Sequence, residues 1–350
     1  METMILNFIF FGLIITASGQ RRATVSVNSG NVVPVNRGNV MPGPFHWTNG
    51  EGEPVEQEEV IELQVERADA IDIPDPIHWT YGEGELGPSH WSTLFPEQCA
   101  ANSESPIDIN TYRTIYDASL KKFAIFYDPP LPVARFAIHN NGHSVEVHTD
   151  SGQFYLSNGG MRHLYKIDQF HFHWGDTSHV GSEHTINGHP APLEMHIVGW
   201  NKDIYRTLKE ASTKPSGLHV FAVLFQISPF DNPELQPIIR VLPRVIDPDI
   251  PVSVKIPATP IQNLLPKHPD RYFRYSGSLT TPRCYTSVIW TVFEQTQYIS
   301  ERQLNYFRQM LLHDDHSREQ VWPTQGLRKH MINNFRPVQP LNGRQVFRSF

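Results

Sequence analysis

The chain has 350 residues, of which 39% are hydrophobic and 19% are charged, and its formal net charge is −7. This composition is typical of a soluble globular protein that is long enough to bury a sizeable core. The negative charge and the lack of any Lys/Arg run argue against a protein that binds nucleic acid.

Residues 1–19 have the pattern of a secretory signal peptide. Residues 4–17 are apolar but too short to span a bilayer, and small residues follow before Gln20. The segment begins without the usual Lys or Arg, so an uncleaved N-terminal anchor stays an alternative. The C-terminus lacks the hydrophobic tail of a lipid-anchor signal. We expect a secreted, extracellular protein without a membrane anchor.

Residues 20–76 form an acidic segment that differs from the rest of the chain. Seven Glu and three Asp against four Arg give it a net charge of −6. Such a composition buries little apolar surface, so we expect a flexible extension. It could contact Ca²⁺, a mineral or an extracellular matrix, although a solvated run of charge is the more common explanation. Residues 45–53 nearly repeat residues 77–85, which we interpret as the remnant of a duplication.

Residues 77–350 are predicted to form one domain that is mainly β, with small peripheral helices. Short alternating hydrophobic stretches are separated by Gly, Pro and Asn-Gly turns, which is the pattern of strands. A helix is expected at residues 300–312 with Ser300 as its N-cap, and weaker ones at residues 204–209 and 233–242. The strands are expected at residues 123–127, 133–140, 144–148, 154–156, 170–174, 194–200, 220–227 and 288–293.

Two of these predicted strands carry histidines on one face. His171 and His173 alternate with aromatic residues, so the two imidazoles share the face opposite the rings. With 18 His in the chain, about one His-x-His pair is expected by chance, and the pair alone is weak evidence for a metal. His196 on the second strand would supply a third imidazole. Three imidazoles with an open fourth position form the ligand set of a catalytic zinc.

A polar residue stands two positions before each of two of these histidines. Gln169 precedes His171 and Glu194 precedes His196, so each shares a strand face with a candidate ligand. Each side chain could accept the second ring N–H of its histidine and thereby fix the orientation of the imidazole. For Glu194, a partly solvated carboxylate on a strand is the alternative.

Several short sequence motifs follow one another along residues 77–350. Gln-Phe-His-Phe-His-Trp-Gly begins at residue 169, Gly-Ser-Glu-His-Thr at 181, Glu-Met-His at 194 and Ser-Leu-Thr-Thr-Pro at 278, with further matches at residues 78–82, 105–109, 140–143 and 336–341. In order and spacing this set resembles the α-class carbonic anhydrases over residues 77–350. The resemblance implies a large, twisted, mostly antiparallel sheet with zinc at the base of a cone-shaped cleft.

The resemblance also implies a reaction, the reversible hydration of CO₂ to bicarbonate and a proton by zinc-bound hydroxide. His171, His173 and His196 would bind the Zn²⁺. Thr280 would accept a hydrogen bond from the hydroxide and donate its own proton to Glu183. The alternative for Thr280 and Thr281 is a Ser-Leu-Thr-Thr-Pro turn whose side chains hydrogen-bond to its own backbone. The alternative for Glu183 is a buried carboxylate that accepts hydrogen bonds from backbone amides.

Further residues around the reacting centre follow from the same resemblance. Thr281 would contact the product, and Tyr81 and Asn141 would lie near the cleft. His143 matches a proton shuttle, with a surface histidine as the alternative, and its apparent pairing with His139 is interpreted as a surface feature. The CO₂ pocket would consist of apolar residues that are otherwise assigned to the core, namely Val198, Val220, Leu279, Val288 and Trp290.

Cys99 and Cys284 match the single disulfide of extracellular members of the family. An even pair in a secreted chain itself suggests a bridge, with two free buried thiols as the alternative. The chain departs from the family at Pro282-Arg283, where two prolines are usual. We expect a trans peptide bond between these residues and a slightly altered loop.

A different class of function stays open. An extracellular matrix or biomineralisation protein could use the fold partly as a binding scaffold, with the acidic extension making the contacts. The presence of three zinc-ligand histidines, Thr280 and Glu183 favours the enzyme. A generic zinc hydrolase is a third and weaker alternative.

Overall fold

The computed structural model describes residues 9–10, 13–14, 78–128, 133–313 and 329–350. The chain divides into two units, Met1–Ala68 and Asp69–Phe350. The described part of the first unit consists of β1 (Ile9–Phe10) and β2 (Leu13–Ile14), which pair antiparallel. The predictions for the acidic extension, and most of those for the signal peptide, lie outside the described residues.

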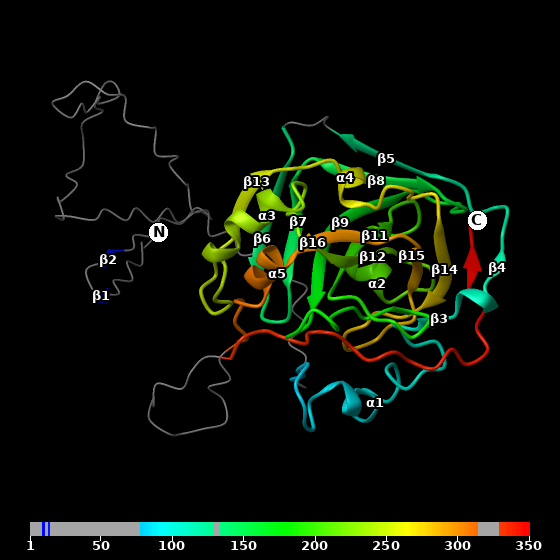
Figure 1. The fold of residues 1–350 in the computed structure, drawn as a ribbon, viewed down its shortest axis with the longest axis horizontal. Coiled ribbons are helices and arrows are strands. Elements are labelled where there is room, and N and C mark those ends of the chain that lie inside the picture. The colour runs from blue at the N-terminus through cyan, green and yellow to red at the C-terminus, as the bar shows by residue number, and fades with distance from the viewer. Residues whose placement is uncertain (1–8, 11–12, 15–77, 129–132, 314–328) are drawn as a thin grey trace, which may run out of the picture. The chain divides into compact units, whose positions relative to one another are not determined.

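A 13-stranded sheet dominates the second unit (Figure 1). Its strands are β4 (Ile115–Tyr116), β5 (Phe123–Asp128), β6 (Arg135–Asn140), β7 (Val145–Ser151), β8 (Gln153–Asn158), β9 (Tyr165–Trp174), β11 (Leu193–Asn201), β12 (Leu218–Ser228), β13 (Val254–Pro257), β14 (Tyr272–Gly277), β15 (Val288–Phe293), β16 (Gln297–Ser300) and β17 (Phe347–Arg348).

The strands follow the order β13-β6-β7-β9-β11-β12-β15-β14-β17-β4, and β16 pairs with β12 while β8 joins β5 to β9. Most neighbours run antiparallel. The exceptions are β12 with β15, β12 with β16, and β17 with β4, which run parallel. The predicted fold class, mainly β with a large twisted sheet, is confirmed.

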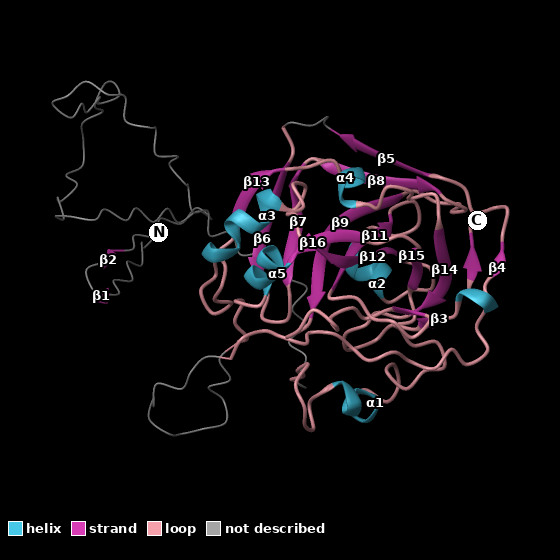
Figure 2. Ribbon diagram, in the orientation of Figure 1, coloured by secondary structure: helices cyan, strands magenta, loops and turns pink. Residues whose placement is uncertain are grey.

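The remaining elements are short (Figure 2). They are η1 (Pro88–His90), α1 (Trp91–Leu94), η2 (Thr111–Arg113), α2 (Leu208–Ser212), α3 (Gln236–Val241), η3 (Leu242–Arg244), α4 (Ile261–Leu264), α5 (Glu301–Phe307) and a two-stranded sheet of β3 (Asp108–Ile109) with β10 (Thr185–Ile186). The predicted N-cap of α5, Ser300, is confirmed. Among the described residues, no helix combines the length and apolarity that crossing a bilayer requires.

The neighbouring strands β9 and β11 position the histidines. Along β9 the aromatic side chains enter the main hydrophobic core, and Phe170, Phe172 and Trp174 are completely buried. The opposite face of β9 therefore carries the imidazoles, as the alternation predicts. Antiparallel pairing places His196 opposite His171 and Glu194 opposite His173.

The predicted disulfide is confirmed, because Cys99 and Cys284 are joined with their Cα atoms 5.0 Å apart. The bridge lies in a small apolar cluster with Trp91 and Phe95, separate from the main core. It links the segment that contains α1 to the loop before β15, two segments that are 185 residues apart in the sequence.

Candidate metal centre

Three imidazoles from β9 and β11 converge on one point. The ring centroids of His173 and His196 lie 4.6 Å apart, and that of His171 lies 5.1 Å and 5.2 Å from them. Nε2 of His173 lies 3.1 Å from Nδ1 of His196, and one nitrogen from each ring lies within 4.8 Å of the others. Two nitrogen ligands of a tetrahedral zinc are separated by about 3.3 Å. The cluster therefore fits a zinc ion after a small adjustment.

The outward nitrogen of each ring has an oxygen acceptor, which leaves the inward nitrogen for a metal. Two of the acceptors are the predicted side chains, and the third is a backbone carbonyl from the C-terminal segment that the sequence did not indicate. The contacts are His171 Nδ1 to Gln169 Oε1 at 2.9 Å, His196 Nε2 to Glu194 Oε1 at 2.7 Å, and His173 Nδ1 to Asn334 O at 2.8 Å.

Burial favours the neutral form of two of these imidazoles, His171 and His173. Burial, followed by repulsion between the neighbouring imidazoles, lowers the pKa of His171 well below its usual value. Burial is also the largest cause of the lowered pKa of His173. A neutral imidazole is the form that binds a metal ion, so no proton has to be removed at neutral pH.

Glu194 is the centre of a buried hydrogen-bond network. It is 0% exposed, so the alternative of a partly solvated carboxylate is wrong. Its Oε2 accepts the backbone N–H groups of Glu183 and His184, and its Oε1 lies 2.7 Å from His184 Nδ1. Burial raises the pKa of Glu194, but the two imidazoles beside it outweigh burial and hold the pKa well below its usual range. Glu194 is therefore a carboxylate at neutral pH.

Glu183 presents one oxygen to the candidate metal position. Its Oε1 accepts the backbone N–H of Arg336 at 2.8 Å. Its Oε2 is buried without a hydrogen-bond partner among the described residues, 3.6 Å from His173 Nε2 and 3.8 Å from His196 Nδ1. Thr280 is also buried, but its expected hydrogen bond to Glu183 is not among the hydrogen bonds of the described residues.

The loop after Thr280 corrects one prediction. The Pro282–Arg283 peptide bond is cis, so the expected trans bond is wrong. The backbone N–H of Cys284 donates to the carbonyl of Thr281 at 2.7 Å and closes a four-residue turn around this bond. The disulfide joins the last residue of this turn, Cys284, to Cys99.

The five predicted pocket residues lie in one apolar cluster. Val198, Val220 and Trp290 are opposite one another across β11, β12 and β15. Val198 is two residues after His196 and so shares its strand face, and the ring of Trp290 lies 4.8 Å from that of His196. Val288 is buried in the same cluster, and Leu279 packs against it.

Of the residues predicted near the cleft, Tyr81 lies next to one of the three histidines. The ring of Tyr81 lies 6.5 Å from that of His173. His143 stacks on Trp79, with ring centroids 4.0 Å apart and planes 13° apart. Burial, followed by two neighbouring imidazoles, lowers the pKa of His143 to about 4. Asn141 accepts the backbone N–H of His143 at 2.9 Å and so holds the turn that carries it.

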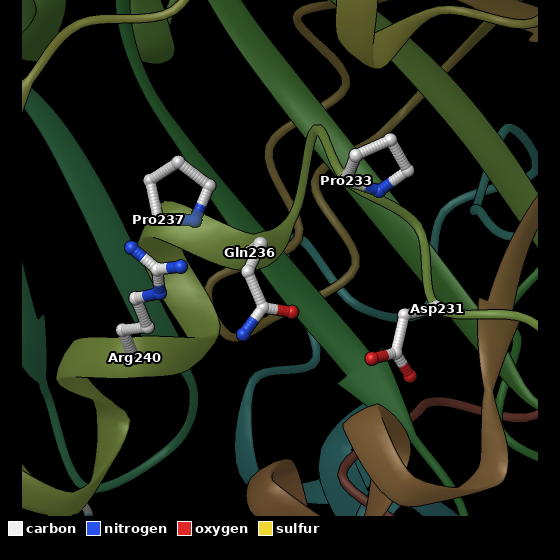
Figure 3. A pocket seen from close by; sticks show the side chains of 5 residues that line it. All are labelled: Asp231, Pro233, Gln236, Pro237 and Arg240. Carbon is white, nitrogen blue, oxygen red and sulfur yellow. The ribbon is translucent and has the colours of Figure 1, made fainter.

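A surface pocket of about 500 Å³ lies elsewhere, at α3 (Figure 3). Two of its polar side chains, Asp231 and Gln236, have hydrogen-bond partners of their own. Asp231 accepts from Ser300 and Arg302, and Gln236 accepts from Gln303. No predicted site residue lines this pocket, whose lining consists of Asp231, Pro233, Gln236, Pro237 and Arg240.

Comparison with known proteins adds independent evidence. Residues 86–350 match the model of the eukaryotic-type carbonic anhydrase family. Human carbonic anhydrase 7 is 37% identical over 270 residues, which is 75% of this chain and 94% of that protein. The mouse carbonic anhydrase 7 is 36% identical over 266 residues, which is 75% of this chain and 94% of that protein. Mouse carbonic anhydrase 1 is 38% identical over 273 residues, which is 76% of this chain and 96% of that protein.

Proposed function

Because the chain belongs to the eukaryotic-type carbonic anhydrase family and is a lyase of that family, we propose that it catalyses the reversible hydration of CO₂ to bicarbonate and a proton. The observation that carries this proposal is the convergence of one nitrogen each from His171, His173 and His196. Three histidine ligands leave a fourth position open for chemistry, whereas structural zinc sites use all four positions.

Zn²⁺ in this site would supply hydroxide at neutral pH by lowering the pKa of a bound water to about 7, the general value for carbonic anhydrases. The protein's own contribution is to fix the ligands. Gln169, Glu194 and the carbonyl of Asn334 hold the outward ring nitrogens, so each imidazole keeps one tautomer and one orientation.

Glu183 and Thr280 would orient the reacting oxygen. The backbone N–H of Arg336 occupies Oε1 of Glu183, which leaves Oε2 as the acceptor for a hydroxyl proton. If the Thr280 hydroxyl donates its proton to that oxygen, the hydroxyl oxygen of Thr280 can only accept a hydrogen bond from the reacting O–H group. This requirement fixes the orientation of the reacting group. Thr281, in the same turn, would contact the product.

The apolar row across β11, β12 and β15 would receive CO₂. CO₂ is apolar and makes few directional contacts, so an apolar wall beside the metal position is suitable. Val198, Val220 and Trp290 supply that wall, and Val288 and Leu279 complete it.

His143 would carry the product proton to solvent. With a pKa of about 4 in the stacked orientation, the imidazole is a poor acceptor for a proton from a group of pKa 7. We therefore propose that the ring leaves Trp79 and enters water, where its pKa rises toward 6.5, before it accepts the proton. Tyr81 and Asn141 stay in place beside this path.

The domain would work outside the cell. The Cys99–Cys284 bridge supports this, because disulfides persist in oxidising compartments and are rare in the cytosol.

Stopped-flow CO₂ hydration by the zinc-loaded chain tests the function. We expect turnover far above the uncatalysed rate, with loss of both zinc and activity in His196→Ala. Thr280→Ala should keep its zinc and lose most activity, while Thr280→Ser keeps both. His163→Ala, at an exposed histidine outside the site, is the control. A chain that binds one zinc and does not accelerate hydration contradicts the proposal.

A further inference from the structure

A second group of metal-binding side chains lies on β6 and β7. His139 of β6 is opposite Glu146 of β7, and His148 follows Glu146 by two residues, so all three share one face of the sheet. Nε2 of His139 lies 3.7 Å from Oε2 of Glu146, and Nε2 of His148 lies 3.5 Å from Oε1. His143, which lies four residues after His139, is not part of this group, because its ring stacks on Trp79.

We propose that His139, Glu146 and His148 form a second binding site for a divalent metal ion, with Zn²⁺ as the natural test ion. Two imidazoles and one carboxylate are a common zinc ligand set. One ligand atom from each residue lies within 4.8 Å of the others. The separations of 3.7 Å and 3.5 Å, which run from the two imidazoles to the two oxygens of Glu146, are close to the value of about 3.3 Å between two zinc ligands. A small closing movement would complete the site.

Stacking and hydrogen bonding orient the three side chains of this site. The two imidazole rings stack with centroids 5.2 Å apart and planes 16° apart, and both direct Nε2 toward the same carboxylate. Nδ2 of Asn141 donates a hydrogen bond to Oε2 of Glu146 at 2.9 Å, which fixes the orientation of the carboxylate. Such supporting hydrogen bonds orient metal ligands and raise the affinity of a site.

The site can be reached from solvent. The side chains of His139 and His148 are 25% and 37% exposed, and that of Glu146 is 17% exposed. Three protein ligands leave room for water or an anion at the remaining position.

The second site uses a different set of ligands from the first. The two sites share no ligand, although Glu146 is opposite His171 across β7 and β9. The third group with metal-ligand spacing, His184 with Glu194 and His196, belongs to the hydrogen-bond network of the first site. The second site can therefore be tested by binding alone, whatever the activity of the enzyme.

Isothermal titration of Zn²⁺ into protein that already carries one zinc is the decisive measurement. We expect one further equivalent to bind. His139→Ala and His148→Ala should each abolish this second binding event and keep the first zinc, which also shows that the variant is folded. Glu146→Gln should weaken the second event at least tenfold. His163→Ala, which removes an exposed histidine beside a single carboxylate of Asp203, should leave both events unchanged.

A spectroscopic measurement identifies the ligands. Cu²⁺ added to the zinc-loaded chain should give an electron paramagnetic resonance spectrum with coupling to two imidazole nitrogens, reduced to one in His148→Ala. The proposal is wrong if the zinc-loaded chain binds no second equivalent. It is equally wrong if the second event persists with unchanged affinity in the double variant His139→Ala/His148→Ala.

Discussion

Glu194 decides which nitrogen of His196 faces the candidate metal position. Its Oε1 lies 2.7 Å from Nε2 of His196, so Nδ1 is the atom left for coordination. The same carboxylate accepts two backbone N–H groups from the segment that carries Glu183. One buried side chain therefore fixes a metal ligand and positions the second carboxylate of the site, and both depend on its negative charge.

At the same scale, the stacking of His143 on Trp79 predicts a measurable pKa. We expect NMR titration of the His143 ring to give a pKa well below 6.5, because the stacked ring is withdrawn from water. Trp79→Ala should raise this pKa toward 6.5. His163→Ala should leave it unchanged. A wild-type value near 6.5 would show that the stacked orientation is not the populated one.

The sequence could predict neighbours along a strand but not partners from distant segments. Gln169 and Glu194 were predictable because a strand brings residues i and i+2 to one face. Asn334 lies 161 residues from His173, and nothing in the local pattern relates them. The neighbours of His139 were missed for the same reason, because Glu146 and His148 lie on the adjacent strand β7.

At the scale of elements, α5 depends on its first turn. Oγ of Ser300 accepts the backbone N–H of Gln303 at 3.0 Å, and Oε1 of Gln303 lies 3.4 Å from the backbone N of Ser300. Oγ of Ser300 also donates to Asp231. Gln303 is itself completely buried. The cap therefore joins the helix to the loop after β12.

Ser300→Ala should destabilise the domain by about 1–2 kcal/mol, because an N-cap bond is lost and Asp231 loses a donor. The free energy of unfolding from urea titration measures this. Ser89→Ala, at an exposed serine whose side chain hydrogen-bonds only to the ring of His90 among the described residues, should change it by less than about 0.5 kcal/mol. Equal effects of the two substitutions would contradict the role assigned to the cap.

Strands rich in apolar and β-branched residues were predictable, even where both faces are buried, as in β11 and β15. β15 has the predicted bounds, and β5 differs by one residue. β14 was missed because its sequence, Tyr-Phe-Arg-Tyr-Ser-Gly, contains a charged residue and no β-branched one. A charged residue such as Arg274 is unusual in a buried strand. Its guanidinium donates hydrogen bonds to Thr291 and to the carbonyl of Gly159.

At the scale of the whole molecule, a buried histidine makes folding sensitive to acid. His219 on β12 is 0% exposed, and its Nε2 lies 3.0 Å from Oγ1 of Thr291. Burial, followed by the charge of Arg274, lowers the pKa of His219 well below 6.5. Below pH 6.5, His219 binds a proton in the unfolded chain but stays neutral in the folded chain, so the folded state loses stability as the pH falls. Above pH 6.5 this residue contributes no pH dependence.

The free energy of unfolding should therefore fall between pH 7.5 and pH 5.5, with His219 contributing about 1.4 kcal/mol. His219→Gln should show a smaller fall than the wild type, even if it is less stable at pH 7.5. His268→Gln, at an exposed histidine, should show the full fall. A fall of the same size in His219→Gln and the wild type would contradict the assignment.

The C-terminal segment has a consequence for biosynthesis. The carbonyl of Asn334 holds His173, and the backbone N–H of Arg336 holds Glu183, so residues far downstream in the sequence complete the candidate metal centre on the central strands. A ribosome synthesises the three histidines well before these residues. Stable uptake of an ion by the nascent chain therefore has to follow the synthesis of Asn334 and Arg336.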